Sequence, residues 1–258
     1  MRSDNMPQTV SAPAAGPGLG PWEVAGDWRH TEGWIGPEGC IEGTDRPRTG
    51  VLFGYLDIVA GSPPSGPINP TVDLQVRLFS QPRQGVIRFT ARTLRQGRSL
   101  YVAEIEMRHA DEEEPFGVGL ATFINRPMAL VDRTERAPGS AGEGDAEGQR
   151  FSRLAGLRRV RPGCLELDVS EMSNHPHRTV SGSTLGRLIE EACLDLFDGA
   201  VFVDELDVRF LDRVKIGPIR ATATTVGSHH DATTVRIEVV DAGHQDRLVT
   251  YGLAVARR

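Results

Sequence analysis

Hydrophobic and polar positions alternate with period two over several segments, which is typical of strands that bury one face. In residues 72–78, the apolar Val72, Leu74, Val76 and Leu78 alternate with polar residues. Further strands are predicted at 86–94, 100–108, 116–124, 206–211, 219–226, 233–240 and 248–255. The connections between neighbours are short, which predicts antiparallel pairing.

A longer apolar segment precedes each group of strands. Residues 50–61 are apolar on nearly every side, which predicts a buried helix, and Ser62-Pro63-Pro64 ends it. Residues 182–198 predict a more amphipathic helix. One helix packed on one antiparallel sheet in each half gives the α+β class, with each sheet wrapped around its central helix.

The two halves repeat each other at an offset of 132 residues. Gly50, Gly54, Leu56 and Ala60 recur as Gly182, Gly186, Leu188 and Ala192. Residues 132–150 between the copies lack apolar periodicity and predict a linker, whereas residues 1–21, rich in Pro, Ala and Gly, predict a disordered tail. The domains are therefore expected at 22–131 and 151–258.

Composition narrows the class of protein. Hydrophobic residues make up 39% of the 258 residues and charged residues 25%, and the net charge is −6. This balance argues against binding to nucleic acid or to an anionic membrane. The three cysteines, Cys40, Cys164 and Cys193, form no Cys-x-x-Cys pair, which favours a reducing cytoplasm. No apolar segment has the length of a membrane helix.

The predicted arrangement resembles the hotdog fold, in which a sheet wraps a central helix, and the resemblance covers both halves. Residues 175–190 resemble the helix-start motif of phenylacetyl-CoA-type thioesterases: Asn-Pro, then Thr-Val-His-Gly-Gly, then Leu, and a carboxylate seven residues after the second Gly. The matching residues are Pro176, Thr179, Val180, Gly182, Leu185 and Glu190. His175, Ser181 and Ser183 stand where the motif has Asn, His and the second Gly.

The first half keeps less of this motif. Gly50 matches the second Gly and Asp57 follows it by seven residues, whereas Arg48 and Thr49 replace the His and the first Gly. A double hotdog acyl-CoA thioesterase is therefore the family that the chain resembles. Both copies depart from the pattern of the motif.

The resemblance implies a site at each helix start. Backbone N–H groups there bind a developing oxyanion, and a carboxylate two turns further along acts as general base or nucleophile. The candidate catalytic residues are Asp57 and Glu190, and the candidate oxyanion or substrate-binding residues are Gly50, Val51, Gly182, Ser183 and His177. For Asp57 the alternative is a charge neutralised by an arginine or by the other half, and for Glu190 a solvated helix face.

The expected ligand is an acyl-CoA or an acyl-carrier-protein thioester, with CoA as part of the substrate and no separate cofactor. Arg95 and Arg98 in the turn after residue 94 are candidates for binding the CoA phosphates, or else ordinary surface arginines. His229-His230-Asp231 lies in a turn, and we expect no metal there. The two halves are expected to pair within one chain, and two such chains could form a homodimer. The expected localisation is the cytoplasm, and the expected role lies in fatty acid metabolism.

Two other functions remain open from the sequence. One is a hotdog hydroxyacyl-thioester dehydratase or hydratase, for which His177 and Glu191 have a suitable spacing. The other is a non-catalytic acyl-thioester binding protein, favoured by the changed residues of the motif.

Overall fold

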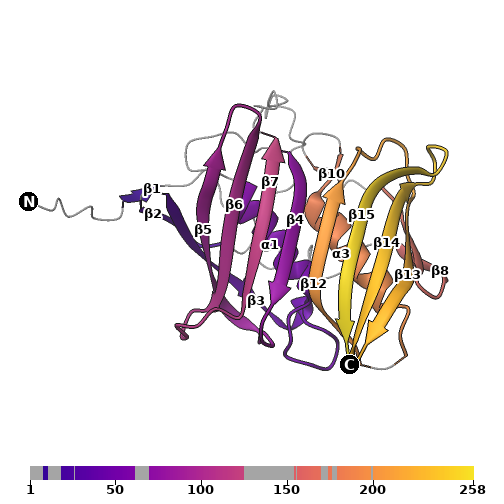
Figure 1. Cartoon of the computed structure of the whole chain (residues 1–258), viewed down its shortest axis with the longest axis horizontal. Helices are drawn as coiled ribbons and strands as arrows, with labels where there is room; N and C mark the ends of the chain where they lie inside the picture. Colours follow the sequence, from indigo (N-terminus) through magenta and orange to yellow (C-terminus); the bar gives the residue numbers. More distant parts are fainter. Residues whose placement is uncertain are drawn as a thin grey trace, which may run out of the picture.

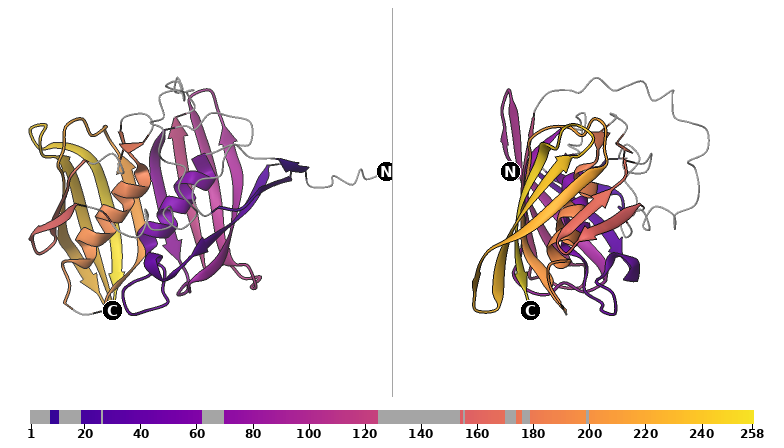
Figure 2. Two further views of the ribbon diagram at one scale, coloured as in Figure 1. Left: turned by 180° about the vertical axis from the view of Figure 1, so that it is seen from behind. Right: turned by 90° about the vertical axis from the view of Figure 1, so that its right-hand side faces the viewer.

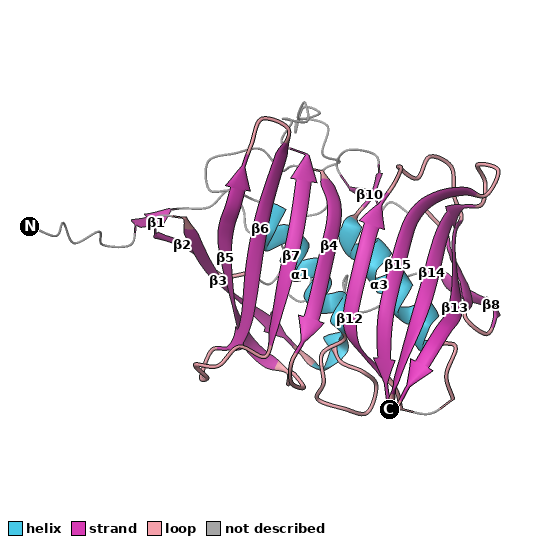
Figure 3. Ribbon diagram, in the orientation of Figure 1, coloured by secondary structure: helices cyan, strands magenta, loops and turns pink. Residues whose placement is uncertain are grey.

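In the part of the chain that the structure describes, one large antiparallel sheet carries two α-helices on a single face, as Figures 1 and 3 show. The computed structural model describes residues 8–10, 19–25, 27–61, 70–124, 154, 156–169, 174–175, 179–198 and 200–258. The sheet contains 13 strands in the order β1-β2-β3-β5-β6-β7-β4-β12-β15-β14-β13-β9-β8. Figure 2 shows that it curves around both helices. The predicted linker 132–150 lies outside the described residues.

Each half of the chain supplies one side of the sheet. The first half contributes β1 (Gln8–Val10), β2 (Trp22–Ala25), β3 (Trp28–Ile35), β4 (Thr71–Leu78), β5 (Gly85–Gln96), β6 (Leu100–His109) and β7 (Gly117–Ile124). The second contributes β8 (Leu157–Arg161), β9 (Cys164–Leu167), β12 (Phe202–Phe210), β13 (Ile219–His229), β14 (Ala232–Asp241) and β15 (Arg247–Arg257). A separate short ribbon joins β10 (Asn174–His175) to β11 (Thr179–Val180).

The helices lie where the apolar segments predicted them. Helix α1 (Thr49–Gly61) is almost entirely buried, which confirms the interpretation of residues 50–61. Helix α3 (Gly182–Leu194) starts as predicted but ends four residues earlier than expected. The Asp195 side chain accepts a hydrogen bond from the Gly163 N–H at 2.8 Å, which ties the chain to the loop before β9 at this point.

The halves meet at β4 and β12, which pair through the centre of the sheet. In this ladder Leu206 lies opposite Val76, Asp207 opposite Gln75, and Val208 opposite Leu74. The 132-residue offset of the sequence repeat relates the Leu206–Val76 pair to the Val208–Leu74 pair. The ladder therefore has the self-complementary form of a two-fold interface. The prediction of a separate sheet for each half is thereby modified, because the two sheets share one continuous ladder.

Several strands had no clear sequence signal. Strand β3 carries charged and aromatic residues on its outer face, so its alternation was missed, although its inward positions are buried. Strand β8 is nearly all exposed at the edge of the sheet and has no apolar face. Within the described part of the chain, no helix has the length and apolar character needed to cross a membrane.

Candidate functional site

Helices α1 and α3 pack antiparallel, and glycines set how closely they approach. A methyl group on Gly186 would lie 2.5 Å from Cδ1 of Phe53, and one on Gly50 would lie 3.0 Å from Cα of Arg187. Only a residue without Cβ allows such contacts. The packing brings the start of each helix beside a carboxylate of the other, Gly50 beside Glu190 and Gly182 beside Asp57.

The start of α3 has backbone N–H groups without an acceptor among the described residues. Ser181 caps the helix, with its hydroxyl accepting a hydrogen bond from the Thr184 N–H at 3.2 Å. Ser181 therefore takes a capping role at the position where the resembling motif has His. Within the described residues, no acceptor is found for the N–H groups of Gly182 and Ser183. These donors and the helix dipole favour an anion at this point.

Asp57 of α1 faces this free helix start. A methyl group on Gly182 would lie 2.8 Å from its Oδ2 and 3.2 Å from Cζ of Phe210. The other carboxylate oxygen, Oδ1, accepts a hydrogen bond from the Thr71 hydroxyl at 2.5 Å. Burial raises the pKa of Asp57 to about 6, while the hydrogen bond from Thr71 opposes the rise. A carboxyl group with this pKa is suited to accept a proton near neutral pH.

The start of α1 is occupied by the protein itself. The two carboxylate oxygens of Glu190 accept hydrogen bonds from the N–H groups of Thr49, at 2.7 Å, and Gly50, at 2.9 Å. The side chain of Glu190 is completely buried, which rules out the solvated helix face considered for it. Glu190 thus stands where an anionic ligand would bind at this helix start.

Further charges surround Glu190. Nη1 of Arg187 lies 3.4 Å from its Oε2, and Arg187 is itself almost fully buried. Glu191 pairs with Arg187 at 2.8 Å and with Arg48 at 3.1 Å. Burial raises the pKa of Glu190, and the two arginines and the Gly50 N–H oppose the rise. The group is a buried, internally paired network that bridges the two helices.

The other predicted site residues are spread more widely. The Val51 N–H donates to the Arg48 carbonyl at 3.0 Å. Arg95 at the end of β5 and Arg98 in the following turn are exposed, in the hairpin that Figure 1 shows at the same upper end of the molecule as the start of α3. His177 lies outside the described residues.

His229 and His230 stack edge to face, with ring centroids 4.0 Å apart, on an exposed turn. Among the described residues no three His, Cys, Asp or Glu side chains group as metal ligands would.

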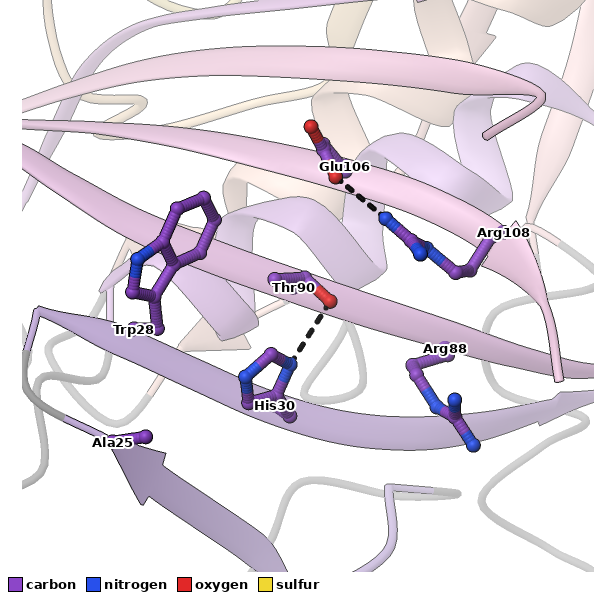
Figure 4. Close-up of a pocket in the computed structure, with 7 residues that line it drawn as sticks. All are labelled: Ala25, Trp28, His30, Arg88, Thr90, Glu106 and Arg108. Carbon is purple, nitrogen blue, oxygen red and sulfur yellow. Dashed lines mark hydrogen bonds and ion pairs between the residues drawn. The ribbon is translucent and has the colours of Figure 1, made fainter. Parts of the chain in front are cut away.

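A shallow depression of about 440 Å³ lies on the opposite face of the sheet (Figure 4). Its lining includes Trp28, His30, Thr90, Glu106 and Arg108. Nδ1 of His30 lies 3.1 Å from the Thr90 hydroxyl, and Arg108 pairs with Glu106 at 2.7 Å. These polar groups pair with one another, although Nε of Arg108 is buried without a hydrogen-bond partner among the described residues. The depression is separated from Asp57 by the sheet.

Comparison with solved structures identifies the fold. A protein of unknown function with a hot dog fold from Alicyclobacillus acidocaldarius aligns with 92% of this chain and 94% of its own, with a TM-score of 0.58 and 14% identity. The chain has the hotdog fold. A provisionally named thioesterase from Novosphingobium aromaticivorans aligns with 94% of this chain and 99% of its own, with a TM-score of 0.65 and 15% identity.

A third similar structure is that of the 12:0-ACP thioesterase from Umbellularia californica. It aligns with 91% of this chain and 98% of its own, with a TM-score of 0.63 and 9% identity. No family model matches the sequence, and no curated protein matches it. At these identities the likeness shows the fold.

Sequence reasoning missed three residues that shape the two helix starts. Thr71, the first residue of β4, binds Asp57, Phe210 at the end of β12 borders Gly182, and Arg187 pairs with Glu190. Only Arg187 had a usable signal, because it precedes Glu190 by three residues and so lies on the same side of its helix. The other two contacts join segments far apart in the sequence.

Proposed function

We propose that this protein hydrolyses an acyl thioester, with acyl-CoA as the expected substrate, at the start of α3. The observation that carries the proposal is the position of Asp57, a carboxylate with a raised pKa that faces helix N–H groups lacking an acceptor among the described residues. The hotdog fold shared with proteins named as thioesterases adds support. In this proposal the chain comprises two tandem hotdog units, and each helix contributes one part of the site.

In the proposed reaction the substrate carbonyl oxygen accepts hydrogen bonds from the N–H groups of Gly182 and Ser183. Oδ2 of Asp57 takes a proton from a water molecule, whose oxygen forms a bond to the carbonyl carbon. The resulting oxyanion is stabilised by the helix N–H groups and dipole. The C–S bond then breaks, and the proton passes from Asp57 to the departing thiolate. The Thr71 hydroxyl donates a hydrogen bond to Oδ1 of Asp57 and so fixes the orientation of the carboxylate.

The proposal places no second reaction at the start of α1. Glu190 already accepts hydrogen bonds from the N–H groups of Thr49 and Gly50. A substrate carbonyl would need these same donors. Displacing Glu190 would leave a buried carboxylate without its donors, which is strongly unfavourable. We therefore assign Glu190 a structural role, in which its carboxylate occupies the position of a substrate oxygen at the start of α1.

The test is hydrolysis of a panel of acyl-CoA thioesters by the purified chain, followed through release of free thiol. Asp57→Asn should lower turnover by about 10²–10⁴-fold, since it removes one general base and keeps the shape of the side chain. Absorbance of an enoyl product, measured in the same mixtures, tests the dehydratase alternative.

Asp73→Asn on β4 is the matched control, because Asp73 is a partly exposed aspartate two residues from Thr71. It should leave turnover unchanged. If Asp57→Asn hydrolyses the best substrate as fast as the unmodified protein does, Asp57 is not the base. If binding occurs without thiol release from any substrate, the protein is an acyl-thioester binding protein.

A further inference from the structure

Arg29 of β3 is a buried cation without a counter-ion among the described residues. It is 2% exposed, and its Nε and Nη1 are buried without a hydrogen-bond partner. Its Nη2 donates to the hydroxyl of Tyr101, which is also 2% exposed. This neutral hydroxyl is a weak replacement for water around a guanidinium, because a buried charge normally requires a charged partner.

Other arginines of the chain differ from Arg29 in this respect. Arg187 is equally buried but pairs with Glu190 and Glu191. Arg92, on the neighbouring strand β5, is partly exposed on the outer face and pairs with Glu104 at 2.9 Å. Arg29 instead points to the helix side of the sheet, where an anion from solution would provide the missing charge.

The strand register relates Arg29 to the proposed catalytic carboxylate. Thr71, which binds Asp57, lies opposite Phe123 in the pairing of β4 with β7, and Phe123 lies opposite Tyr101 in the pairing of β7 with β6. Neighbouring strands are about 4.8 Å apart, so the Tyr101 backbone is roughly 10 Å from that of Thr71. These residues therefore share one face and one end of the sheet.

The residues between the two points are apolar. Phe123 is fully buried, its ring lies against Tyr101 with centroids 5.7 Å apart, and a methyl group on Gly61 would lie 3.0 Å from it. Gly61 ends α1 one helical turn after Asp57. An acyl chain with its thioester at Asp57 would have to pass between these buried apolar side chains, and its far end would then reach the cation of Arg29.

We propose that Arg29 and Tyr101 bind a carboxylate at the far end of the acyl chain, so that the preferred substrate is an ω-carboxyacyl thioester. This inference rests on the proposed function, because the distance is counted from Asp57. The guanidinium presents a planar set of donors that matches a carboxylate, and the Tyr101 hydroxyl supplies a further donor. A carboxylate here would neutralise Arg29 and select against chains that end in a methyl group.

The experiment compares suberyl-CoA with octanoyl-CoA, which have the same chain length and differ in the terminal carboxylate. The unmodified protein should have the higher kcat/KM for suberyl-CoA. Arg29→Met should lower kcat/KM for suberyl-CoA about 10- to 100-fold, the range expected for losing hydrogen bonds to a charged group, and leave octanoyl-CoA unchanged or improved. Arg92→Gln is the control, with both substrates unaffected.

Binding is measured separately from hydrolysis, by the change in Tm on adding free suberate or free octanoate to the intact chain. Suberate should raise Tm more than octanoate does, and Arg29→Met should abolish the difference. Tyr101→Phe, which removes only the hydroxyl, should reduce the suberate effect. This second variant keeps the test decisive if Arg29→Met does not fold.

The two proposals fail in distinguishable ways. If Asp57-dependent hydrolysis occurs but Arg29→Met alters both substrates equally, or neither, the carboxylate site is wrong and hydrolysis stands. An equal loss of kcat/KM for both substrates would mean that Arg29 contacts the CoA portion, which both share, or that it is needed for folding. If suberate stabilises the protein through Arg29 while no thioester is hydrolysed, the anion site stands and the proposed hydrolysis falls.

Discussion

Asp57 and Gly182 touch across the two helices in the same way as Glu190 and Gly50. In both pairs a methyl group on the glycine would lie 2.8 Å from a carboxylate oxygen. The pairs differ in what the carboxylate does, because Glu190 accepts two backbone N–H groups and Asp57 is bound by the Thr71 hydroxyl. The two helix starts therefore share a geometry, while the start of α3 is the one whose donors have no acceptor among the described residues.

The raised pKa of Asp57 predicts a cost in stability at neutral pH. Its pKa is about 6 in the folded chain against an ordinary value of 3.8, so the folded state binds the proton more tightly. Stability contributed by this group is complete below about pH 4 and falls as pH rises to about 6. Asp57→Asn should therefore stabilise the protein at pH 7.5, by at most about 3 kcal/mol, since 2.2 pKa units correspond to that value.

The measurement is the free energy of unfolding at pH 7.5 and at pH 4 for Asp57→Asn and for the control Asp73→Asn. The gain of Asp57→Asn should be present at pH 7.5 and absent at pH 4. A gain of equal size at both values would show that charge burial is not its cause. The turnover of the unmodified protein should also rise with pH through about 6, because the base must be ionised.

Gly182→Ala should impair catalysis more than stability. The added methyl group would approach Oδ2 of Asp57 and the Phe210 ring, and the carboxylate has to move aside. A displacement of about 1 Å at a reacting group can lower turnover by about 10²-fold. Gly50→Ala is the counterpart at the other helix start, where it should lower Tm with little change in turnover per folded molecule. Equal losses of turnover in both variants would contradict the assignment of a single site.

Glu190→Gln should lower stability and retain activity. The amide replaces one acceptor oxygen with a donor, so the N–H of Thr49 or Gly50 loses its partner inside the protein. Arg187 also loses the negative charge with which it pairs. The expected loss is about 3 kcal/mol, or roughly 5–10 °C in Tm. Thermal unfolding and turnover measured on the same sample check this. Loss of turnover with an unchanged Tm would move the catalytic site to the start of α1, with Glu190 as its carboxylate.

Cleavage within residues 132–150 should leave the two fragments associated. The β4–β12 ladder and the contact between α1 and α3 join the halves independently of the connecting segment. An inserted protease site, followed by size-exclusion chromatography of the cleaved chain, tests this. The fragments should elute together, whereas separate elution would mean that the covalent link is needed to hold the halves in place.

The sequence predicted the elements that bury one face in a regular pattern. Residues 50–61 gave α1 because their apolar character leaves no solvent face, and the 132-residue repeat predicted the equivalent position of α3. Asp57 was recognisable as a candidate because a carboxylate is costly in such a helix. The glycines at 50 and 182 were also identifiable from the repeat.

What the sequence did not predict depends on contacts between distant segments. Glu190 is followed in the sequence by Glu191, Asp195 and Asp198, and its burial follows from where α1 starts rather than from these neighbours. Arg29 precedes the first helix in a strand with mixed charges, so its inward direction was visible only from the register of β3. Short-range patterns carry no information on which side chains are joined by the packing of two helices.

The continuous ladder through β4 and β12 also bears on how the two halves can evolve. In a homodimer of single hotdog chains every substitution occurs twice, so a change that closes one helix start closes the other as well. When both copies lie in one polypeptide, each position mutates alone. After a gene duplication and fusion, one active centre can therefore become a purely structural contact between the helices while selection maintains the other.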